Sequence, residues 1–297
     1  MPAPLIPPDQ IAFAPLLLDA ETRLIAAGIE DARLDLLYLA EAAFDVPVAQ
    51  LRLRGGVMVP ASGLPAFQEK VARRLTREPV QRILGRWEFW GLDLALGPET
   101  LIPRPDTETV VEAVLKRRPD RHCPWRLLDL GTGTGAILLA LLSEYPHATG
   151  IGVDLSPDAA AVARGNAQSL GLGARAAFIA GDWAGALVGC FDIVVSNPPY
   201  IPDAEIEGLQ PEVARFEPRR ALAGGPDGLA PYRLLAGEMG RLLMPGGLVA
   251  MEHGADQGPA VAGLLHAAGL ADVVTIPDLG GRDRVALGTL PVKPAHP

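Results

Sequence analysis

Short apolar segments alternate with helix-forming segments from Arg126 onward. The apolar segments end in Gly, Pro, Asp or Asn, a pattern that is typical of buried strands. We expect strands at 126–130, 148–154, 174–182, 191–197, 246–254, 272–278 and 284–290, and helices at 135–145, 156–171, 229–244 and 257–269. Such strands form a mostly parallel sheet with helices on both faces. The predicted fold class is α/β, with ligands beyond the carboxyl ends of the strands.

The first part of the chain has a different pattern. Residues 9 to about 80 are predicted to be helical, since apolar residues recur at three- and four-residue steps in 28–46 and 64–78, with a loop at 52–63. Leu92, Leu94 and Leu96 then alternate with other residues after Gly91, which predicts a hairpin. The expected division is therefore a small helical domain at 1–84, a β-hairpin linker at 85–104 and a larger domain at 105–297.

Composition narrows the class of protein. A chain of 297 residues with 49% hydrophobic and 21% charged residues can bury a sizeable core. The net charge of -9 argues against binding nucleic acid by phosphate neutralisation. Cys123 and Cys190 have no metal-ligand spacing and suggest no disulfide framework, so we expect no metal and a reducing compartment. With no signal peptide and no long apolar run, a cytoplasmic protein without a membrane span is expected.

A glycine-rich turn follows the first strand of the larger domain, in LLDLGTGTGAILLALL. Gly131, Gly133 and Gly135 allow a tight turn and a close approach of backbone to a ligand. The spacing is GxGxG, which weakens a dinucleotide interpretation. A plain strand-to-helix turn explains this motif equally well when it is taken alone.

Acidic and aromatic residues follow the next two strands. Asp154 ends the second strand, where a carboxylate can accept hydrogen bonds from the ribose of NAD or of S-adenosylmethionine. Helix capping is the alternative, but Ser156 is the better N-cap candidate and would leave Asp154 free. Asp182 and Trp183 follow the third strand, where they could contact an adenine, although a lone Trp also suits a core.

The fourth strand leaves the sheet through SNPPYI, residues 196–201. Asn197 and Pro198 each precede a proline and are therefore biased toward extended backbone, and Pro198 and Pro199 have no N–H. The Pro198 carbonyl and the Asn197 amide oxygen are thus two fixed acceptors, which suit an NH₂ group. Tyr200 adds a flat face for stacking. An ordinary proline turn requires neither the Asn nor the aromatic residue.

This set of motifs resembles class I S-adenosylmethionine methyltransferases that act on planar nitrogens. Five ordered blocks, LIPRPDTE (101–108), DLGTGTGAI (129–137), VSNPPYI (195–201), FEPRRALAGGPDGL (216–229) and GRDRV (281–285), together resemble the HemK/PrmC family. Its members methylate the side-chain amide of the glutamine in the GGQ motif of class 1 peptide chain release factors. The resemblance spans about Arg77 to Val285. It implies a Rossmann-like seven-stranded sheet and an N-terminal domain that binds the release factor.

The resemblance also implies residue roles, with S-adenosyl-L-methionine as cofactor. The residues implied in cofactor binding are Gly131, Thr132, Gly133, Thr134, Gly135, Asp154, Trp183 and Asn197. Those implied in holding the substrate glutamine are Asn197, Pro198, Pro199 and Tyr200, of which Asn197, Pro198 and Tyr200 are the catalytic set. The family often has an EIG-type segment where this chain has MEHGADQ, so His253 is interpreted as a local substitution and not a base.

Other interpretations remain open at this stage. The segment 216–229 is expected to form a partly mobile flap, in which Arg219 or Arg220 either pairs with an acid or is solvated. A ribosomal-protein glutamine methyltransferase, or an adenine-N6 methyltransferase holding a flipped base, would share the same corner. A methyltransferase fold that only binds a partner is the non-enzymatic alternative. We expect a monomer whose partner is a release factor, with no direct contact to nucleic acid.

Overall fold

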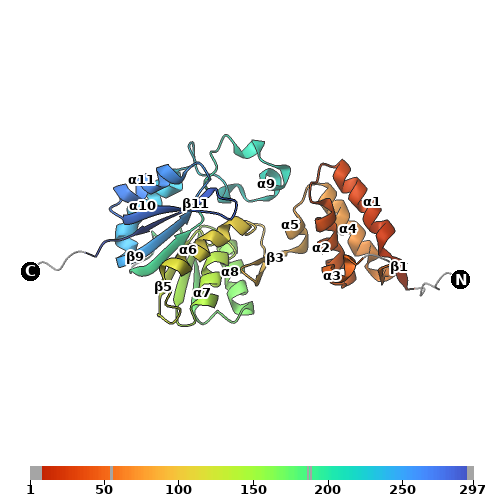
Figure 1. Cartoon of the computed structure of the whole chain (residues 1–297), viewed down its shortest axis with the longest axis horizontal. Helices are drawn as coiled ribbons and strands as arrows, with labels where there is room; N and C mark the ends of the chain where they lie inside the picture. Colours follow the sequence, from red (N-terminus) through yellow and green to blue (C-terminus); the bar gives the residue numbers. More distant parts are fainter. Residues whose placement is uncertain (1–8, 54–55, 186, 188, 293–297) are drawn as a thin grey trace, which may run out of the picture. The chain divides into compact units, whose positions relative to one another are not determined.

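The computed structural model describes residues 9–53, 56–185, 187 and 189–292, and the chain divides into two compact units after Gly85 (Figure 1). In these described stretches, no helix is both long and apolar enough to cross a membrane. The hairpin that was expected to link two domains is part of the second unit, which begins at Arg86.

The first unit is helical, as the sequence predicts. Its helices are α1 (Phe13–Ala26), α2 (Ala32–Phe44), α3 (Val48–Leu51), α4 (Leu64–Leu75) and α5 (Val80–Leu84), with a 3-10 turn η1 (Ala61–Gly63). Two short strands were missed: β1 (Gln10–Ala12) pairs antiparallel with β2 (Met58–Pro60). The prediction of helix from residue 9 and of a plain loop at 52–63 was therefore wrong there. Strands of three residues are too short to show a period of two.

Aromatic packing and one buried ion pair join the helices of this unit. The rings of Phe13, Phe44 and Phe67 lie 5.3 to 6.3 Å apart and form its centre. Arg74 of α4 donates through Nε to Asp35 of α2 at 2.7 Å, and both side chains are buried. Because an unpaired buried charge is costly, this pair fixes how the two helices pack.

The hairpin consists of β3 (Arg86–Phe89) and β4 (Leu92–Ala95). Trp90 and Gly91 form its two-residue turn, and both have positive φ (55° and 69°), as a type I′ turn requires. The backbone of Ala95 exchanges hydrogen bonds with the side-chain amide of Asn166, donating to Oδ1 at 2.9 Å and accepting from Nδ2 at 3.1 Å. These bonds anchor the hairpin to the rest of the second unit.

A seven-stranded, mostly parallel sheet forms the second unit, as predicted. Its strands are β5 (Arg126–Leu130), β6 (Thr149–Asp154), β7 (Ala176–Ala180), β8 (Phe191–Ser196), β9 (Leu243–Glu252), β10 (Ala271–Pro277) and β11 (Asp283–Thr289). They lie in the order β10-β11-β9-β8-β5-β6-β7, and β11 is antiparallel to both of its neighbours. The strand order reverses at β5: the next strands along the chain, β6 and β7, lie on one side of it, and β8 lies on the other side.

Helices cover both faces of this sheet (Figure 1). On one face lie α6 (Glu108–Arg117), α7 (Ala136–Glu144) and α8 (Pro157–Ser169), and on the other lie α10 (Ala230–Leu242) and α11 (Gly258–Ala267). Leu127 faces the first group and Leu128 the second, since successive strand residues point to opposite faces. Helix α6 and the short α9 (Pro211–Phe216) were not predicted from the sequence.

The buried pair of the first unit gives a stability prediction. Asp35→Ala leaves Arg74 without its carboxylate and should lower the unfolding free energy of this unit by about 3–5 kcal/mol. Asp19→Ala is the matched control, because Asp19 pairs with Arg23 in solvent (3.4 Å, side chains 72% and 53% exposed) and should cost about 1 kcal/mol or less. Native-state hydrogen exchange of the α2 and α4 amides in the intact chain measures both. Equal effects would contradict the prediction.

Candidate active site

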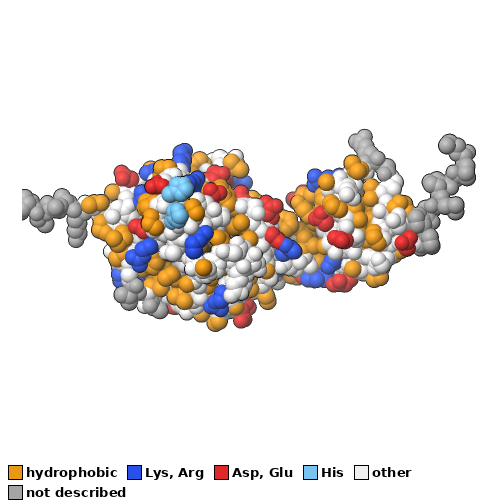
Figure 2. Space-filling model, turned by 90° about the horizontal axis from the view of Figure 1, so that it is seen from below, with side chains coloured by type: hydrophobic (Ala, Val, Ile, Leu, Met, Phe, Trp, Pro, Cys, Tyr) orange, Lys and Arg blue, Asp and Glu red, His pale blue; other side chains and the backbone are white. Residues whose placement is uncertain are grey.

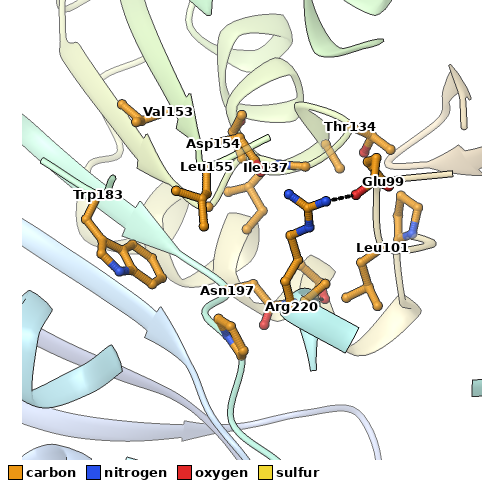
Figure 3. A pocket seen from close by; sticks show the side chains of 18 of the residues that line it. Glu99, Leu101, Thr134, Ile137, Val153, Asp154, Leu155, Trp183, Asn197 and Arg220 are labelled. Atoms are coloured by element: carbon orange, nitrogen blue, oxygen red, sulfur yellow. Dashed lines mark hydrogen bonds and ion pairs between the residues drawn. The ribbon is translucent and has the colours of Figure 1, made fainter. Parts of the chain in front are cut away.

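A cleft lies beyond the carboxyl ends of the central strands (Figure 3). Its walls come from residues 99–107, the glycine turn after β5, the end of β6, the turn after β7 and the corner after β8. Arg220 and Ala221 of the 3-10 helix η4 (Arg219–Ala221) complete it. The cleft is therefore at the point where the strand order reverses, as the fold class predicts.

The glycine turn presents open backbone to this cleft. Gly131, Gly133 and Gly135 have φ of 76°, 55° and 83°, which L side chains rarely adopt. A Cβ on Gly133 would meet no protein atom within 4 Å, so this position leaves space for a ligand. Gly135 does not line the cleft, and a Cβ there would crowd Ala163 and Phe178 at 3.3 Å. Close packing therefore explains why residue 135 is a glycine, whereas the family resemblance implied that Gly135 contacts the cofactor.

Asp154 connects the glycine turn to the start of α8. Its Oδ2 accepts from Gly133 N and its Oδ1 from Ser156 N, both at 2.9 Å. The Ser156 hydroxyl accepts from Ala159 N at 3.3 Å, which confirms Ser156 as the N-cap. The expectation that capping by Ser156 would leave Asp154 free was wrong, because its carboxylate also organises backbone. Asp154 still lines the cleft and has further lone pairs to offer.

Trp183 and Leu155 provide apolar surface near Asp154 (Figure 3). Trp183 has a φ of 48°, an unusual backbone for a non-glycine residue, and its ring lies 3.6 Å from where a Cβ of Gly131 would be. Leu155 is 59% exposed although it is large and apolar. Together with Asp182 these side chains line one end of the cleft, where a flat heterocycle would fit. Leu155 was not predicted as a site residue, because a sequence does not show which apolar side chains are exposed in the fold.

The proline corner contributes two of its four residues to the cleft. Asn197 and Pro199 line it, whereas Pro198 is buried and Tyr200 is half-buried outside the lining. Burial raises the pKa of Tyr200 to about 12, so this phenol stays protonated. Gln257 Nε2 donates to the Tyr200 carbonyl at 2.9 Å and fixes the far end of the corner.

The segment 216–229 packs directly against that corner. Ile201 N donates to Leu222 O at 3.0 Å, and Gly224 N donates to Ile201 O at 2.8 Å. A Cβ on Gly228 would lie 2.3 Å from the Tyr200 carbonyl oxygen, so only glycine fits there. These contacts explain the density of glycine in this segment.

Two ion pairs link this segment to residues 99–107. Arg220 pairs with Glu99 in the cleft (Figure 3), so the pairing with an acid is confirmed for Arg220. Arg104 pairs with the buried Glu217 at 2.9 Å. Two of the blocks that carry the family resemblance are therefore neighbours in space.

Sequence reasoning missed two buried carboxylates beneath the cleft. Asp129 and Glu252 are each 1% exposed, and burial raises the pKa of both to about 7. Asp129 accepts from the Thr132 hydroxyl at 2.6 Å. Glu252 ends β9 and interacts with the side chains of Thr107 and Asn197, which lower its pKa against the effect of burial. The available signal was the position of each acid at the end of an apolar strand.

Thr107 and His253 both lie near the Glu252 carboxylate, but they make different contacts. Asn197 Nδ2 donates to the Thr107 hydroxyl at 3.1 Å, which joins the proline corner to the 101–108 block. His253 is fully buried, its Nδ1 lies 2.7 Å from the Gly254 carbonyl, and burial lowers its pKa. His253 does not line the cleft. Its interpretation as a local substitution and not a base stays a prediction.

These positions define a class of protein. An open sheet of this kind binds a nucleotide-like ligand where the strand order reverses. Here the glycine turn and Asp154 lie on one wall of the cleft and Asn197 lies on another, so a ligand along the turn would present its reactive end to an amide. This is the arrangement of a class I methyltransferase.

Comparison with known proteins agrees with this class and narrows it. Residues 124–268 match the methyltransferase domain family and residues 16–85 match the PrmC N-terminal domain family. The chain is 50% identical over 278 residues to the release factor glutamine methyltransferase of Rhodospirillum rubrum, covering 92% of this chain and 85% of that one. It is 47% identical over 270 residues to the one of Caulobacter vibrioides, covering 91% and 93%. The chain belongs to the release factor glutamine methyltransferase family.

A solved structure supports the fold independently. A methyltransferase from Pyrococcus furiosus superposes with a TM-score of 0.51 at 19% identity, covering 76% of this chain and 100% of that one. The Rossmann-like methyltransferase fold is thereby confirmed.

The role of Asp154 can be tested by binding. Asp154→Ala removes a carboxylate that orders Gly133 and faces the cleft, so S-adenosylmethionine affinity should fall about ten- to a hundred-fold. Asp158→Ala is the matched control, because Asp158 is exposed in the first turn of α8 and does not line the cleft. Isothermal titration calorimetry measures both. Unchanged affinity of the Asp154 variant would contradict the assignment.

Proposed function

We propose that this chain transfers a methyl group from S-adenosylmethionine to the side-chain amide nitrogen of the GGQ glutamine in class 1 release factors, with Asn197 holding that amide. One observation carries the residue assignment. The Nδ2 atom of Asn197 donates to Thr107, so Oδ1 is the polar atom that remains for a ligand in the cleft. An oxygen acceptor suits a substrate group that carries two N–H bonds.

The residues present suit this cofactor. The backbone at Gly131, Thr132, Gly133 and Thr134 would contact its methionine portion, and Asp154 would accept from its ribose hydroxyls. Asp182, Trp183 and Leu155 would enclose its adenine, as the exposed apolar surface there suggests. When bound, the cofactor supplies a methyl group that is already activated by a sulfonium charge. The open space at Gly133 supports a ligand lying against this turn.

The chemical problem is the weak nucleophilicity of an amide. Its nitrogen lone pair is delocalised into the carbonyl, the same resonance that gives peptide bonds a rotational barrier of about 18–20 kcal/mol. In our proposal the Asn197 Oδ1 and the Pro198 carbonyl each accept one amide hydrogen of the substrate. Pro199 and Tyr200 would pack against the glutamine side chain.

Two fixed acceptors would favour the reactive form of the substrate nitrogen. They orient its lone pair and stabilise the more positive, less planar nitrogen that develops during attack. The nitrogen gains a methyl group and a positive charge, and then loses a proton to solvent. No side chain needs to remove that proton beforehand.

Electrostatics bear on the remaining alternatives. Acidic and basic side chains are interspersed on the face in Figure 2, and the net charge is -9. Both features disfavour a nucleic-acid adenine-N6 methyltransferase, which would neutralise phosphates. We therefore propose no direct contact with nucleic acid. We also propose that the chain acts as a monomer in the cytoplasm and binds a release factor through its first unit. A ribosomal-protein glutamine is the second candidate substrate, because it would use the same acceptors.

Methyl transfer provides the test. Asn197→Ala removes one acceptor and should lower kcat on a release factor by about 10²-fold or more. The assay uses labelled S-adenosylmethionine with release factors whose GGQ glutamine is intact or replaced. Label should appear on the intact factor and vanish with the replacement.

Calorimetry with the cofactor serves as the control for intact folding of the Asn197 variant. Near-normal turnover by that variant would refute its assigned role. Label that appears only on a ribosomal protein, or only on RNA or DNA, would refute the proposed substrate.

A further inference from the structure

We infer that Thr107 and ionised Glu252 are positioning residues, which fix the side-chain amide of Asn197 with its oxygen toward the substrate. This inference rests on the proposed role of Asn197 and extends it. Neither residue lies among those that the sequence singled out for a role. Their contribution would be to decide which of the two ends of the Asn197 amide faces the cleft.

The sheet register brings these groups together. In the parallel pairing of β8 with β9, Ser196 lies opposite Met251, so Asn197, which directly follows β8, comes next to Glu252, the last residue of β9. Thr107 comes from the 3-10 helix η2 (Pro105–Thr107), far away in the sequence. It is 4% exposed and its hydroxyl accepts from Asn197 Nδ2 at 3.1 Å.

Counting donors and acceptors gives one consistent arrangement. An ionised Glu252 can only accept, and the Thr107 hydroxyl has one hydrogen to donate. Thr107 accepts from Asn197, so its hydrogen is available for the Glu252 carboxylate. The side chains of Thr107 and Asn197 both lie close enough to that carboxylate to lower its pKa against the effect of burial. A flipped Asn197 amide would turn its oxygen toward these acceptors and lose the bond from Nδ2 to the Thr107 hydroxyl.

The carboxylate also influences the acceptor that faces the substrate. Hydrogen bonds in a chain polarise one another in a low-dielectric interior. A negative charge at Glu252 draws the Asn197 amide hydrogens and leaves Oδ1 more negative, which strengthens its bond to the substrate N–H. The same charge lies near the nitrogen that becomes positive during methyl transfer. Positioning and electrostatics therefore act in the same direction.

Other charged and titratable groups face Glu252 from every side. Arg284 of β11 favours the ionised form, and Asp106 of η2 disfavours it. Arg284 is itself paired with Asp278 at 3.1 Å and Asp106 at 3.3 Å, so it does not neutralise Glu252 alone. Tyr200, from the corner, has its pKa raised further by Glu252.

Tyr232 and His253 are two further titratable neighbours of Glu252. Tyr232 of α10 donates to the Glu252 backbone carbonyl at 2.7 Å, and burial together with the Glu252 charge raises the pKa of this phenol too. Burial lowers the pKa of the adjacent His253, so its imidazole is neutral at pH 7. Glu252 Oε2 has no hydrogen-bond partner among the residues that the structure describes. A buried carboxylate with an unused acceptor is costly, and such groups are common at functional sites.

Burial raises the pKa of Glu252 to about 7, so its charge changes within the working range of pH. Above this value the carboxylate is ionised and orders Asn197. Below it, a protonated Glu252 becomes a donor and permits the flipped amide. We therefore expect kcat of the wild-type chain to rise with pH from about pH 6 to about pH 8.

Variants of Glu252 test the pH dependence. Glu252→Gln keeps the size but cannot ionise, so kcat should fall about ten-fold or more and lose its rise through pH 7. Asp129→Asn is the matched control, because Asp129 is the other buried carboxylate under the cleft with a pKa near 7. The Asp129 variant should retain the rise. Retention of the rise in the Glu252 variant would overturn the inference.

Variants of Thr107 test positioning without changing any charge. Thr107→Val removes the hydroxyl at nearly constant shape and should lower kcat about ten-fold or more, while affinity for S-adenosylmethionine in calorimetry is unchanged. Thr107→Ser restores the hydroxyl and should recover most of the activity. Equal kcat for wild type and the Val variant would overturn the inference even if the Glu252 variant fails to fold.

One parallel measurement separates this inference from the proposed function. If Asn197→Ala is inactive on the release factor while Thr107→Val and Glu252→Gln are fully active, the positioning inference fails alone. If Asn197→Ala retains activity, the proposed function of the corner fails as well.

Discussion

The parallel register of three adjacent strands determines what the site can be. Leu130 of β5 pairs with Ser196 of β8, and Ser196 pairs with Met251 of β9. The next residues along the chain are Gly131, Asn197 and Glu252, so three groups with different chemistry lie together at the carboxyl ends of these strands. A shift of one residue in any pairing would turn these side chains to the opposite face. The cleft therefore depends on hydrophobic cores on both sides of the sheet that fix this register.

Rigid local contacts then preserve that alignment. Asp154 links the glycine turn to α8, Asn166 links the hairpin to the same helix, and Gln257 fixes the carbonyl of Tyr200. Because each contact joins backbone groups from different elements, the cleft walls cannot move independently. Pre-organisation of this kind is what the mechanism proposed above requires, because it uses no acid–base catalyst. The polar groups then contribute by position and not by reactivity.

The sequence predicted the elements whose signals are local. Apolar runs predicted all seven strands of the large sheet, and Gly91 between two alternating runs predicted the hairpin. Helix α6 was missed because it directly follows PRPDT, where two prolines obscured its start. Asp154 was expected to be free because Ser156 was the better N-cap candidate, and its bond to Gly133 was missed because that bond depends on the folded turn. The partners of Asn197 could not be predicted, since Thr107 and Glu252 meet it only through the packing of distant segments.

The central claim is that Asn197 presents an oxygen to the glutamine amide in the cleft. A crystal structure of the chain with S-adenosylhomocysteine and a GGQ-containing release factor tests this most directly. It should show the glutamine nitrogen about 2.9 Å from Asn197 Oδ1, with Nδ2 still bonded to Thr107. A glutamine whose carbonyl oxygen accepts from Asn197 Nδ2, or one bound outside the cleft, would contradict it.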